Sequence, residues 1–268
     1  MLTVGSTTIF ASVAIIVSFC VLVLLRLKKQ FKVIVIDGCI GAGKSTLLDV
    51  LADELSARGY RVVPVKEPVE KWKKSGLLVR FYSNVSRYAY HFQTMAFHDR
   101  VAANIAAHQA NVRPNFKEAI IDALFESLGF PTKPLLFILE RSNFTDPLFM
   151  EMLHEDGLVD DLEMSNYKDW SDMWGKVMPY TPDLFVYLKP EIDVCMARCN
   201  ARKREGESAV TLEYQIKLEA KHDTFFSQSH VKLSDDTAVK CVVLQTNEDF
   251  RTDRIKSLVA DRFLTWIK

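Results

Sequence analysis

The segment that most constrains the fold of this chain lies at residues 38–46 and reads Gly-Cys-Ile-Gly-Ala-Gly-Lys-Ser-Thr. It has the G-x-x-x-x-G-K-[ST] spacing of a phosphate-binding P-loop. An apolar run at residues 33–36 precedes it and an amphipathic run at 47–55 follows it, so the loop should join a strand to a helix. The backbone N–H groups of such a loop surround an anion at a helix start. The pattern predicts a nucleoside-triphosphate site; the alternative is a glycine-rich turn that binds no ligand.

Each position of this loop is a candidate contact for the phosphates of a nucleoside triphosphate. Lys44 would reach the β- and γ-phosphates, and Ser45 would offer its hydroxyl to a Mg²⁺ ion. The predicted cofactor-binding residues of the loop are Gly38, Cys39, Ile40, Gly41, Ala42, Gly43, Lys44, Ser45 and Thr46.

The length and the charge of the chain limit the kinds of partner that it can have. Its 268 residues can bury one sizeable core, and its 34 basic and 34 acidic side chains cancel. This balance argues against nucleic acid as a partner. The five cysteines form no paired framework, so we expect free thiols in a reducing compartment.

The N-terminal segment has the composition of a membrane anchor. Residues 1–25 carry no charged side chain, residues 9–25 are almost wholly apolar, and a basic cluster follows directly. We therefore expect residues 1–30 to be a transmembrane helix with a basic flank, and residues 31–268 to form a cytosolic catalytic domain. A secretory signal would need a basic start and a small-residue cleavage site. A mitochondrial location is the remaining alternative, although mitochondrial presequences are arginine-rich and amphipathic.

Short apolar runs alternate with longer helical ones from residue 32 onward. This order predicts an α/β fold with a parallel five-stranded sheet that helices cover on both faces, and ligands at the carboxyl ends of its strands. The expected strands are 32–37, 61–66, 135–139, 183–188 and 239–245. The expected helices lie near 46–58, 84–110, 142–155, 164–178, 190–204, 211–228 and 249–267.

Charged side chains follow two of the expected strands. Glu67 stands just after the second strand, where its carboxylate could accept a proton from a hydroxyl that attacks the γ-phosphate. Glu140 and Arg141 stand after the third, where the acid could help to hold Mg²⁺ and the guanidinium could bind phosphate oxygens. By themselves, these residues would also fit a solvated or capping glutamate and an ordinary ion pair at a helix start.

An arginine cluster follows the fourth expected strand. Arg198 and Arg202 are four residues apart and share a helix face, with Arg204 just beyond. Such a cluster could close over the transferring phosphoryl group and neutralise its charge. The alternative is a solvated charged face.

These segments, in this order, resemble the deoxynucleoside kinases of the deoxycytidine, deoxyguanosine, thymidine-2 and insect type. The resemblance covers nearly everything from about residue 32 to residue 267. It includes Tyr167-Lys168-Asp169-Trp170, Leu212-Glu213-Tyr214 and Asn247-Glu248-Asp249-Phe250. It implies a P-loop kinase fold, ATP as phosphate donor, Mg²⁺, a deoxynucleoside acceptor and a homodimer.

The resemblance also implies roles for particular residues. The implied catalytic residues are Glu67 as general base with Arg141, Arg202 and Arg204, and the implied metal ligands are Ser45 and Glu140. The donor contacts beyond the loop are Arg198, Glu248, Asp249 and Phe250. The substrate contacts are Glu67, Trp72, Tyr82, Phe92, Gln93, Arg100, Arg141, Asp146 and Glu207, of which Gln93 pairs with the base edge and Tyr82 and Glu207 hold the sugar 3′-hydroxyl.

Two positions bear on the choice of base. Arg100 and Asp146 fall where the deoxycytidine and deoxyguanosine kinases carry a charged pair, whereas thymidine-accepting relatives have small or apolar residues there. We therefore expect deoxycytidine or purine deoxynucleosides to be preferred over thymidine. Met150, with Phe149 beside it, stands where relatives stack an aromatic ring on the base, so either the register shifts by one or the stacking is softer.

One segment bears on the oligomeric state. The connection at residues 111–134 is longer than relatives usually have between the helix of Gln93 and the third strand, and 115–128 could form an extra amphipathic helix.

The expected function is transfer of the ATP γ-phosphoryl to a deoxynucleoside 5′-hydroxyl in nucleotide salvage. The alternative is a membrane-tethered nucleotide-binding module without kinase activity. A switch GTPase would need an N-K-x-D segment, which the sequence lacks, and a mononucleotide kinase would need a further basic pocket.

Overall fold

The computed structural model describes residues 31–112, 133–204, 210–233, 236–245 and 247–267, together with Ser18, Leu124, Leu128 and Gly129. The strands are β1 (Phe31–Gly38), β2 (Arg61–Val65), β3 (Leu135–Glu140), β4 (Leu184–Leu188), β5 (His230–Lys232) and β6 (Ala238–Leu244). The helices are α2 (Lys44–Ala57), α3 (Val69–Lys74), α4 (Leu77–Ser83), α5 (Val85–Asn111), α7 (Pro147–Glu155), α8 (Asp161–Val177), α9 (Ile192–Arg202), α10 (Leu212–Phe225) and α11 (Asp253–Ile267).

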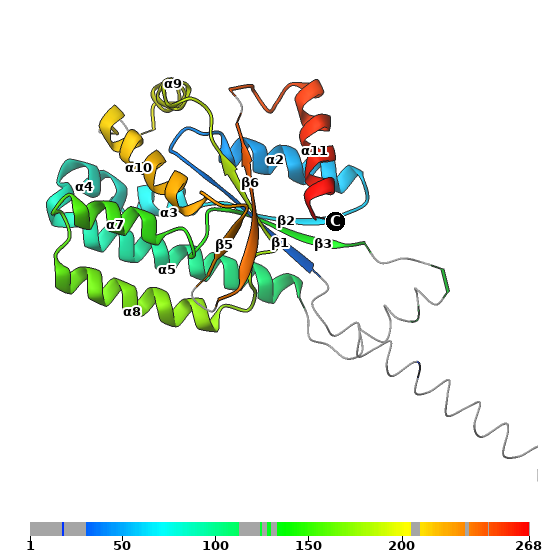
Figure 1. Cartoon of the computed structure of the whole chain (residues 1–268), viewed down its shortest axis with the longest axis horizontal. Helices are drawn as coiled ribbons and strands as arrows, with labels where there is room; N and C mark the ends of the chain where they lie inside the picture. The colour runs from blue at the N-terminus through cyan, green and yellow to red at the C-terminus, as the bar shows by residue number, and fades with distance from the viewer. Residues whose placement is uncertain are drawn as a thin grey trace, which may run out of the picture.

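The strands form one six-stranded sheet in the order β2-β3-β1-β4-β6-β5 (Figure 1). Every pair is parallel except β5 and β6, which are antiparallel. The prediction of a wholly parallel five-stranded sheet is therefore wrong, although the α/β class agrees with a P-loop kinase fold. The sequence did not reveal β5 because this edge strand is three residues long and buries only Val231.

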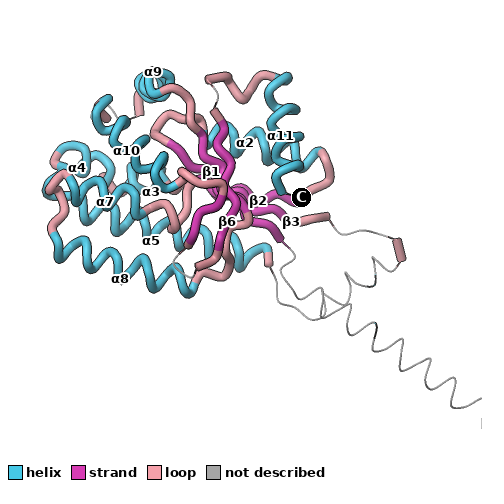
Figure 2. Tube along the Cα trace, in the orientation of Figure 1, coloured by secondary structure: helices cyan, strands magenta, loops and turns pink. Residues whose placement is uncertain are grey.

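Helices cover both faces of the sheet (Figure 2). All of β1 is buried except Lys32, as expected for a central parallel strand covered on both sides. Ile34 and Ile36 pack in one core with apolar side chains of α2 and α11, whereas Val33 and Val35 pack on the opposite face in a core that reaches α5. The P-loop thus leaves the sheet at the end of its best-buried strand.

A third core lies among α3, α4, α5, α7 and α8 and is rich in aromatic side chains. Trp72, Phe81, Phe92, Phe97 and Tyr167 belong to it. The sequence analysis contained no prediction of α3 or α4, whose six and seven residues are too few to show a clear helical period.

Local capping decides where several predicted helices begin. The Asn84 side chain accepts a hydrogen bond from Arg87 N at the start of α5, and Thr211 caps α10 in the same way. The helix predicted from residue 164 starts at Asp161 instead, because Asp160 and Glu163 form a capping box. The helix predicted from residue 142 starts at Pro147, since Arg141 has a left-handed backbone (φ 63°) and a turn follows it.

The predicted transmembrane helix and membrane-anchored location are corrected. Within the described ranges, the structure contains no helix both long enough and apolar enough to cross a bilayer. Except for Ser18, residues 1–30 lie outside the described residues, as does most of the helix predicted at 115–128. The membrane anchor is therefore withdrawn.

Candidate active site

Two adjoining cavities open at the carboxyl ends of the central strands, where β1 lies between β3 and β4. The first has a volume of about 270 Å³ and the second about 460 Å³. Gly41, Lys44, Ser45, Glu140 and Arg202 line both. Side chains from α3, α4, α5 and α7 also line the first cavity, and residues 247–251 line the second. The P-loop therefore separates two compartments, one on the side of the aromatic core and one on the side of α9.

The P-loop needs its glycines for conformation and for space. Gly41 and Gly43 have φ values of 87° and 98°, which side chains rarely tolerate. A Cβ atom on Gly41 would overlap the carbonyl oxygen of Cys195, and one on Gly43 would lie 3.3 Å from the Phe250 ring. The loop is thus packed tightly against α9 and the segment after β6.

Lys44 is buried at the start of α2 and faces both cavities. Its Nζ donates to the carbonyl oxygens of Gly38 (3.1 Å) and Cys39 (2.8 Å). Burial, with the positive charge of Arg141, lowers the pKa of Lys44 to about 8. A bound phosphate would supply the counter-charge that favours the protonated amine.

Ser45 and Glu140 lie together on the cavity wall. The Ser45 hydroxyl donates to Glu140 Oε1 at 2.6 Å, and Glu140 Oε2 accepts a hydrogen bond from Glu67 N at 3.5 Å. A hydroxyl beside a carboxylate is the oxygen donor set that suits Mg²⁺ when substrate phosphates provide further ligands. These residues therefore fit the metal that the sequence analysis expected.

The carboxylate of Glu67 lies between two arginines. Arg100 donates to its Oε1 through Nη2 (2.5 Å) and Nε (3.2 Å), and Arg141 Nε lies 3.5 Å from the same oxygen. Burial alone would raise the pKa of Glu67, but the charges of Arg100, Arg141 and Lys44 outweigh it and lower the pKa. Glu67 is thus an ionised acceptor that shares a cavity with Lys44.

Arg141 is held on several sides. Its Nη1 donates to the buried carboxylate of Asp37 at 2.9 Å, and its backbone N–H donates to Ile36 O. Its guanidinium lies 4.5 Å from the centre of the Phe149 ring. These contacts fix a guanidinium at the cavity that also contains Glu67.

Aromatic rings form the wall of the first cavity away from the P-loop. Phe92 stacks on Phe81 at 4.6 Å and meets Trp72 edge-on at 5.4 Å, and Tyr82 packs beside Phe81. Gln93 lines the same cavity with only 2% of its surface exposed. Flat apolar walls with one buried amide suit a planar ligand that carries hydrogen-bonding groups on its edge.

The charged pair expected beside Gln93 is present. Arg100 forms an ion pair with Asp146, and its guanidinium lies 5.3 Å from the centre of the Trp72 ring. Tyr167 of α8 donates a 2.5 Å hydrogen bond to Asp146 Oδ2. Arg100 therefore connects the carboxylate of Glu67 to the wall that contains Gln93.

The structure decides between the two alternatives for Met150. Phe149 lines the cavity, whereas Met150 is fully buried in the aromatic core. The cavity-facing ring is thus shifted by one position from the expected one.

The arginine cluster after β4 and the segment after β6 lie around the two cavities. Arg198 donates to the carbonyl oxygens of Ala42 (3.4 Å), Asn247 (2.8 Å) and Glu248 (3.1 Å). Arg202 lines both cavities and Arg204 the first. Thr46, Glu248, Asp249 and Phe250 also line the second cavity, whereas Glu207 lies outside the described residues.

The sequence analysis did not assign several residues that the structure places at the site. Tyr214 and Phe81 line the first cavity. The amide of Gln215 accepts from Ile40 N (3.2 Å) and donates to Ile40 O (2.5 Å), so α10 holds the P-loop backbone directly. Tyr214 belongs to a segment that carries the family resemblance, which was the available signal for it. Gln215 gave none, because a buried glutamine in a helix has no distinctive spacing.

Comparison with known proteins agrees with this geometry. A family model described as deoxynucleoside kinase matches residues 34–261. A probable deoxycytidine kinase of fowlpox virus is 34% identical over 224 residues, which are 83% of this chain and 81% of that protein. Deoxycytidine kinase 2 of Gallus gallus is 30% identical over 252 residues, with 85% and 87% covered. The deoxycytidine kinase of Homo sapiens is 30% identical over 253 residues, with 86% and 89% covered.

The match confirms the resemblance seen in the motifs and the expected enzyme class. It extends over the P-loop, the strand ends and the arginine segment that surround the two cavities. The chain therefore belongs to the deoxynucleoside kinase family, whose members use a nucleoside triphosphate to phosphorylate a deoxynucleoside.

Proposed function

We propose that this deoxynucleoside kinase transfers the γ-phosphoryl group of ATP to the 5′-hydroxyl of deoxycytidine or a purine deoxynucleoside, in preference to thymidine, as a step of nucleotide salvage. The observation that carries the preference is the Arg100–Asp146 ion pair beside buried Gln93. The curated relatives described above are named as deoxycytidine kinases, which supports the same preference.

The preference follows from the shape and polarity of the wall. Arg100 and Asp146 offer a donor and an acceptor side by side, and both are buried. An amino-bearing base can add hydrogen bonds to these groups, whereas a thymine methyl group would crowd them and press the ion pair apart. A buried polar group that loses its partner costs about 1–3 kcal/mol, enough for a strong discrimination between bases.

In the proposed mechanism Glu67 orients the 5′-hydroxyl and accepts its proton. Its lowered pKa makes it a weak base in the resting site. Proton transfer can nevertheless occur late, because phosphoryl transfer proceeds through a loose transition state in which positioning and electrostatic stabilisation dominate. Arg100 and Arg141 hold the carboxylate in place for this task.

Cationic side chains around the two cavities would stabilise the charge of the transferring group. The P-loop N–H groups and Lys44 hold the donor phosphates, and Arg141, Arg202 and Arg204 neutralise charge on the phosphoryl oxygens. Ser45 and Glu140 would hold Mg²⁺, which neutralises phosphate charge when bound. Phe250 and its neighbours at the second cavity would lie beside the donor base.

The alternative, a nucleotide-binding module without kinase activity, is not favoured. Such a module needs the second cavity, but it has no use for a carboxylate between two arginines beside an aromatic compartment. Absence of ADP release both with and without deoxynucleosides would support the alternative, whereas ADP release that needs no deoxynucleoside would indicate an ATPase.

The proposal predicts a definite order of acceptors for the purified protein with ATP. We expect kcat/KM for deoxycytidine or a purine deoxynucleoside to exceed that for thymidine, since only the former can pair with Arg100 and Asp146. The double substitution of Arg100→Leu with Asp146→Ala should change the ratio of these kcat/KM values in favour of thymidine by about tenfold or more. Thymidine as the best acceptor of the unmodified enzyme would refute the preference.

We also propose that the enzyme is a homodimer. Leu162, Trp170, Met173 and Val177 of α8 are large, apolar and exposed, and they recur at helical spacing. An apolar helix face of this kind is typical of a surface that another chain covers.

A further inference from the structure

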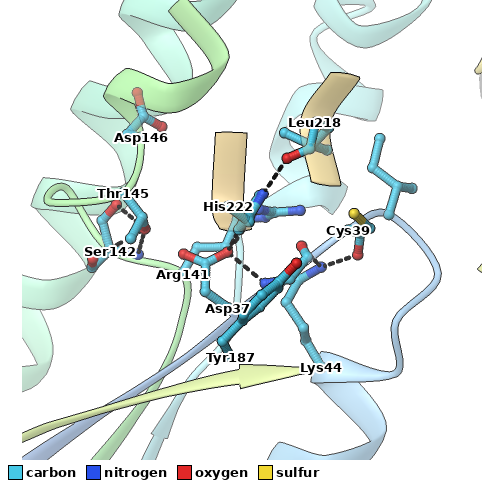
Figure 3. Close-up of polar contacts among 12 residues, drawn as sticks. Asp37, Cys39, Lys44, Arg141, Ser142, Thr145, Asp146, Tyr187, Leu218 and His222 are labelled. Atoms are coloured by element: carbon cyan, nitrogen blue, oxygen red, sulfur yellow. Dashed lines mark hydrogen bonds and ion pairs between the residues drawn. The ribbon is translucent and has the colours of Figure 1, made fainter. Parts of the chain in front are cut away.

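A chain of buried charged groups runs beneath the P-loop, from α10 to the first cavity. His222 Nε2 lies 3.1 Å from Asp37 Oδ1, and Arg141 Nη1 lies 2.9 Å from the same oxygen. The His222 and Asp37 side chains are both fully buried. Figure 3 shows these contacts leading from Leu218 through His222 and Asp37 to Arg141. The mechanism described above uses Arg141 but neither of the two residues behind it.

The hydrogen-bond partners of His222 determine its protonation. Nδ1 lies 2.7 Å from the carbonyl oxygen of Leu218, which can only accept, so Nδ1 must carry a hydrogen. Nε2 faces Asp37, and a carboxylate also can only accept. Burial alone would raise the pKa of Asp37, but Arg141 and His222 outweigh it and lower the pKa, which keeps this residue ionised. Both ring nitrogens therefore donate, and the ring is an imidazolium.

The surroundings of His222 accommodate a positive ring. Tyr187 of β4 stacks on the imidazole at 5.6 Å with 17° between the planes, and Phe149 and Phe226 also contact it. The charged, hydroxyl or titratable groups that face this cluster include Cys39, Lys44, Glu67, Glu140, Thr145, Lys189, Glu219 and Asp223. Lys189 and the Tyr187 hydroxyl both bind Asp223, so those charges pair with each other. Asp37 is thus the carboxylate that His222 contacts directly.

Asp37 in turn sets the position of Arg141. Its Oδ1 accepts from Gly38 N at 2.7 Å as well as from Arg141 and His222. Arg141 has a left-handed backbone, a conformation that the surrounding contacts must maintain. We propose that His222, held as an imidazolium, is a positioning residue that fixes Asp37 and thereby aims the Arg141 guanidinium at the transferring phosphoryl group.

Loss of the His222 proton would disturb this arrangement directly. A neutral ring that still donates from Nδ1 to Leu218 would turn the lone pair of Nε2 toward the Asp37 carboxylate. The carboxylate would then move or rotate away, and Arg141 would lose its fixed counter-ion. A small displacement of a charged group at such a site costs a large part of its stabilisation of the transition state.

The kinetic test uses two substitutions of different severity in the full-length enzyme. His222→Phe keeps a ring against Tyr187 but cannot donate, and we expect kcat to fall about tenfold or more while KM for the deoxynucleoside changes less than about twofold. His222→Gln can still donate one hydrogen bond to Asp37 and should recover part of that loss. His154→Gln on the surface of α7 is the matched control and should leave both constants unchanged.

Coupling to Asp37 distinguishes positioning from a general loss of packing. Asp37→Asn should lower kcat, and adding His222→Phe to it should cost little more, because both act through the same contact. A purely structural role would leave the two losses additive and would give no recovery in His222→Gln relative to His222→Phe. Additive losses would overturn the proposal.

A spectroscopic measurement tests the protonation itself without any turnover. The chain has six histidines, so ¹⁵N-labelled imidazole signals can be assigned to His222 by comparison with His222→Gln. Two protonated nitrogens at neutral pH are expected, and a neutral ring protonated only on Nδ1 would overturn the inference. The inference rests on the family's phosphoryl transfer and not on the preferred base. An enzyme that favours thymidine would therefore refute the proposed preference and leave this test unaffected.

Discussion

At the scale of single residues, the first cavity has its charged groups in place before any ligand binds. Glu67 is held by Arg100 and Arg141, and Arg141 is held in turn by Asp37. Asp37, Arg100 and Arg141 are buried, Glu67 is partly buried, and each has a partner of opposite sign. Groups fixed in this way need little rearrangement when charge develops on a substrate, which is how such sites lower barriers.

Replacement of the proposed base tests its role directly. Glu67→Gln keeps the shape of the side chain and can still bind a hydroxyl, but it cannot accept a proton. We expect kcat to fall at least about a hundredfold while KM for the deoxynucleoside changes little, because the lost interaction belongs to the transition state. Steady-state kinetics at saturating ATP would measure this, with Glu70→Gln at the cavity edge as the control. An unchanged kcat would show that Glu67 is not the base.

The lowered pKa of Lys44 predicts that the free enzyme captures ATP less well at alkaline pH. Its pKa is lowered to about 8 in the free site, so the amine is charged below that pH and neutral above it. We expect kcat/KM for ATP, which reports the free enzyme, to fall as pH rises through about 8. The fall in kcat should come at higher pH, since bound phosphates favour the charged amine.

The effect of Lys44 on stability has the opposite sign. Above about pH 8 the unfolded chain keeps the Lys44 proton while the folded chain releases it. This group therefore raises the free energy of unfolding as pH rises toward 10.5, the ordinary pKa of the lysine amine. Denaturation measured over the same range distinguishes loss of binding from loss of fold. A kcat/KM for ATP that stays flat between pH 7 and pH 10 would contradict the assignment.

Some of these residues could be predicted from the sequence and others could not. The P-loop, Glu67 and Glu140 were predictable because they follow apolar runs, and parallel strands bring their carboxyl ends to one edge. Phe149, rather than Met150, faces the cavity because α7 begins only after a turn, which the sequence pattern does not reveal. The buried contact between Asp37 and His222 joins β1 to α10, and no local spacing signals it.

At the scale of whole elements, the capped start of α8 affects the cavity wall that contains Arg100 and Asp146. The helix begins at a capping box in which the Asp160 side chain accepts from Glu163 N and the Glu163 carboxylate accepts from Asp160 N. One turn farther on, Tyr167 projects from α8 and binds Asp146. The start of this helix thus affects the position of a residue at the proposed base-reading wall.

Removal of the cap should destabilise the protein by a predictable amount. Asp160→Ala leaves the first N–H groups of α8 without their acceptor and should lower the free energy of unfolding by about 1 kcal/mol. Asp160→Asn keeps an accepting oxygen and should behave nearly as the unmodified protein. Urea denaturation measures both. Equal stability of the alanine and asparagine variants would show that the cap contributes nothing.

The elements themselves were predicted unevenly, for physical reasons. β1, β3 and β4 were located within one residue, because buried parallel strands appear as unbroken apolar runs. β2 and β6 are only partly buried, and their valines gave the signal that located them equally well. The short helices α3 and α4 were not predicted, because their side chains pack according to the cavity rather than to a helical period. Strand β5 pairs with β6 through three residues, too few for an alternating pattern.

At the scale of the whole molecule, the sheet and the aromatic core divide the site between them. The sheet supplies the P-loop and the charged strand ends, and the aromatic core among α3, α4, α5, α7 and α8 supplies the rings and Gln93. Figure 1 shows α8 at the outer edge of this helical layer, beside α5 and α7. The helix therefore has one side against the substrate wall and the other available to a second chain.

Disruption of the exposed face of α8 should separate the proposed dimer. Leu162→Glu with Met173→Glu would place two charges in a surface that must exclude water, whereas exposed substitutions alter monomer stability by only about 0.5 kcal/mol. Sedimentation equilibrium should give twice the chain mass of 30.6 kDa for the unmodified protein and a single chain mass for the double variant. Leu258→Glu on α11 is an equally apolar, exposed control and should remain dimeric.

A monomeric unmodified protein would exclude the dimer, and a double variant that stays dimeric would assign the interface to another face. Because Tyr167 projects from the same helix onto Asp146, separation of the chains should also change KM for the deoxynucleoside more than KM for ATP.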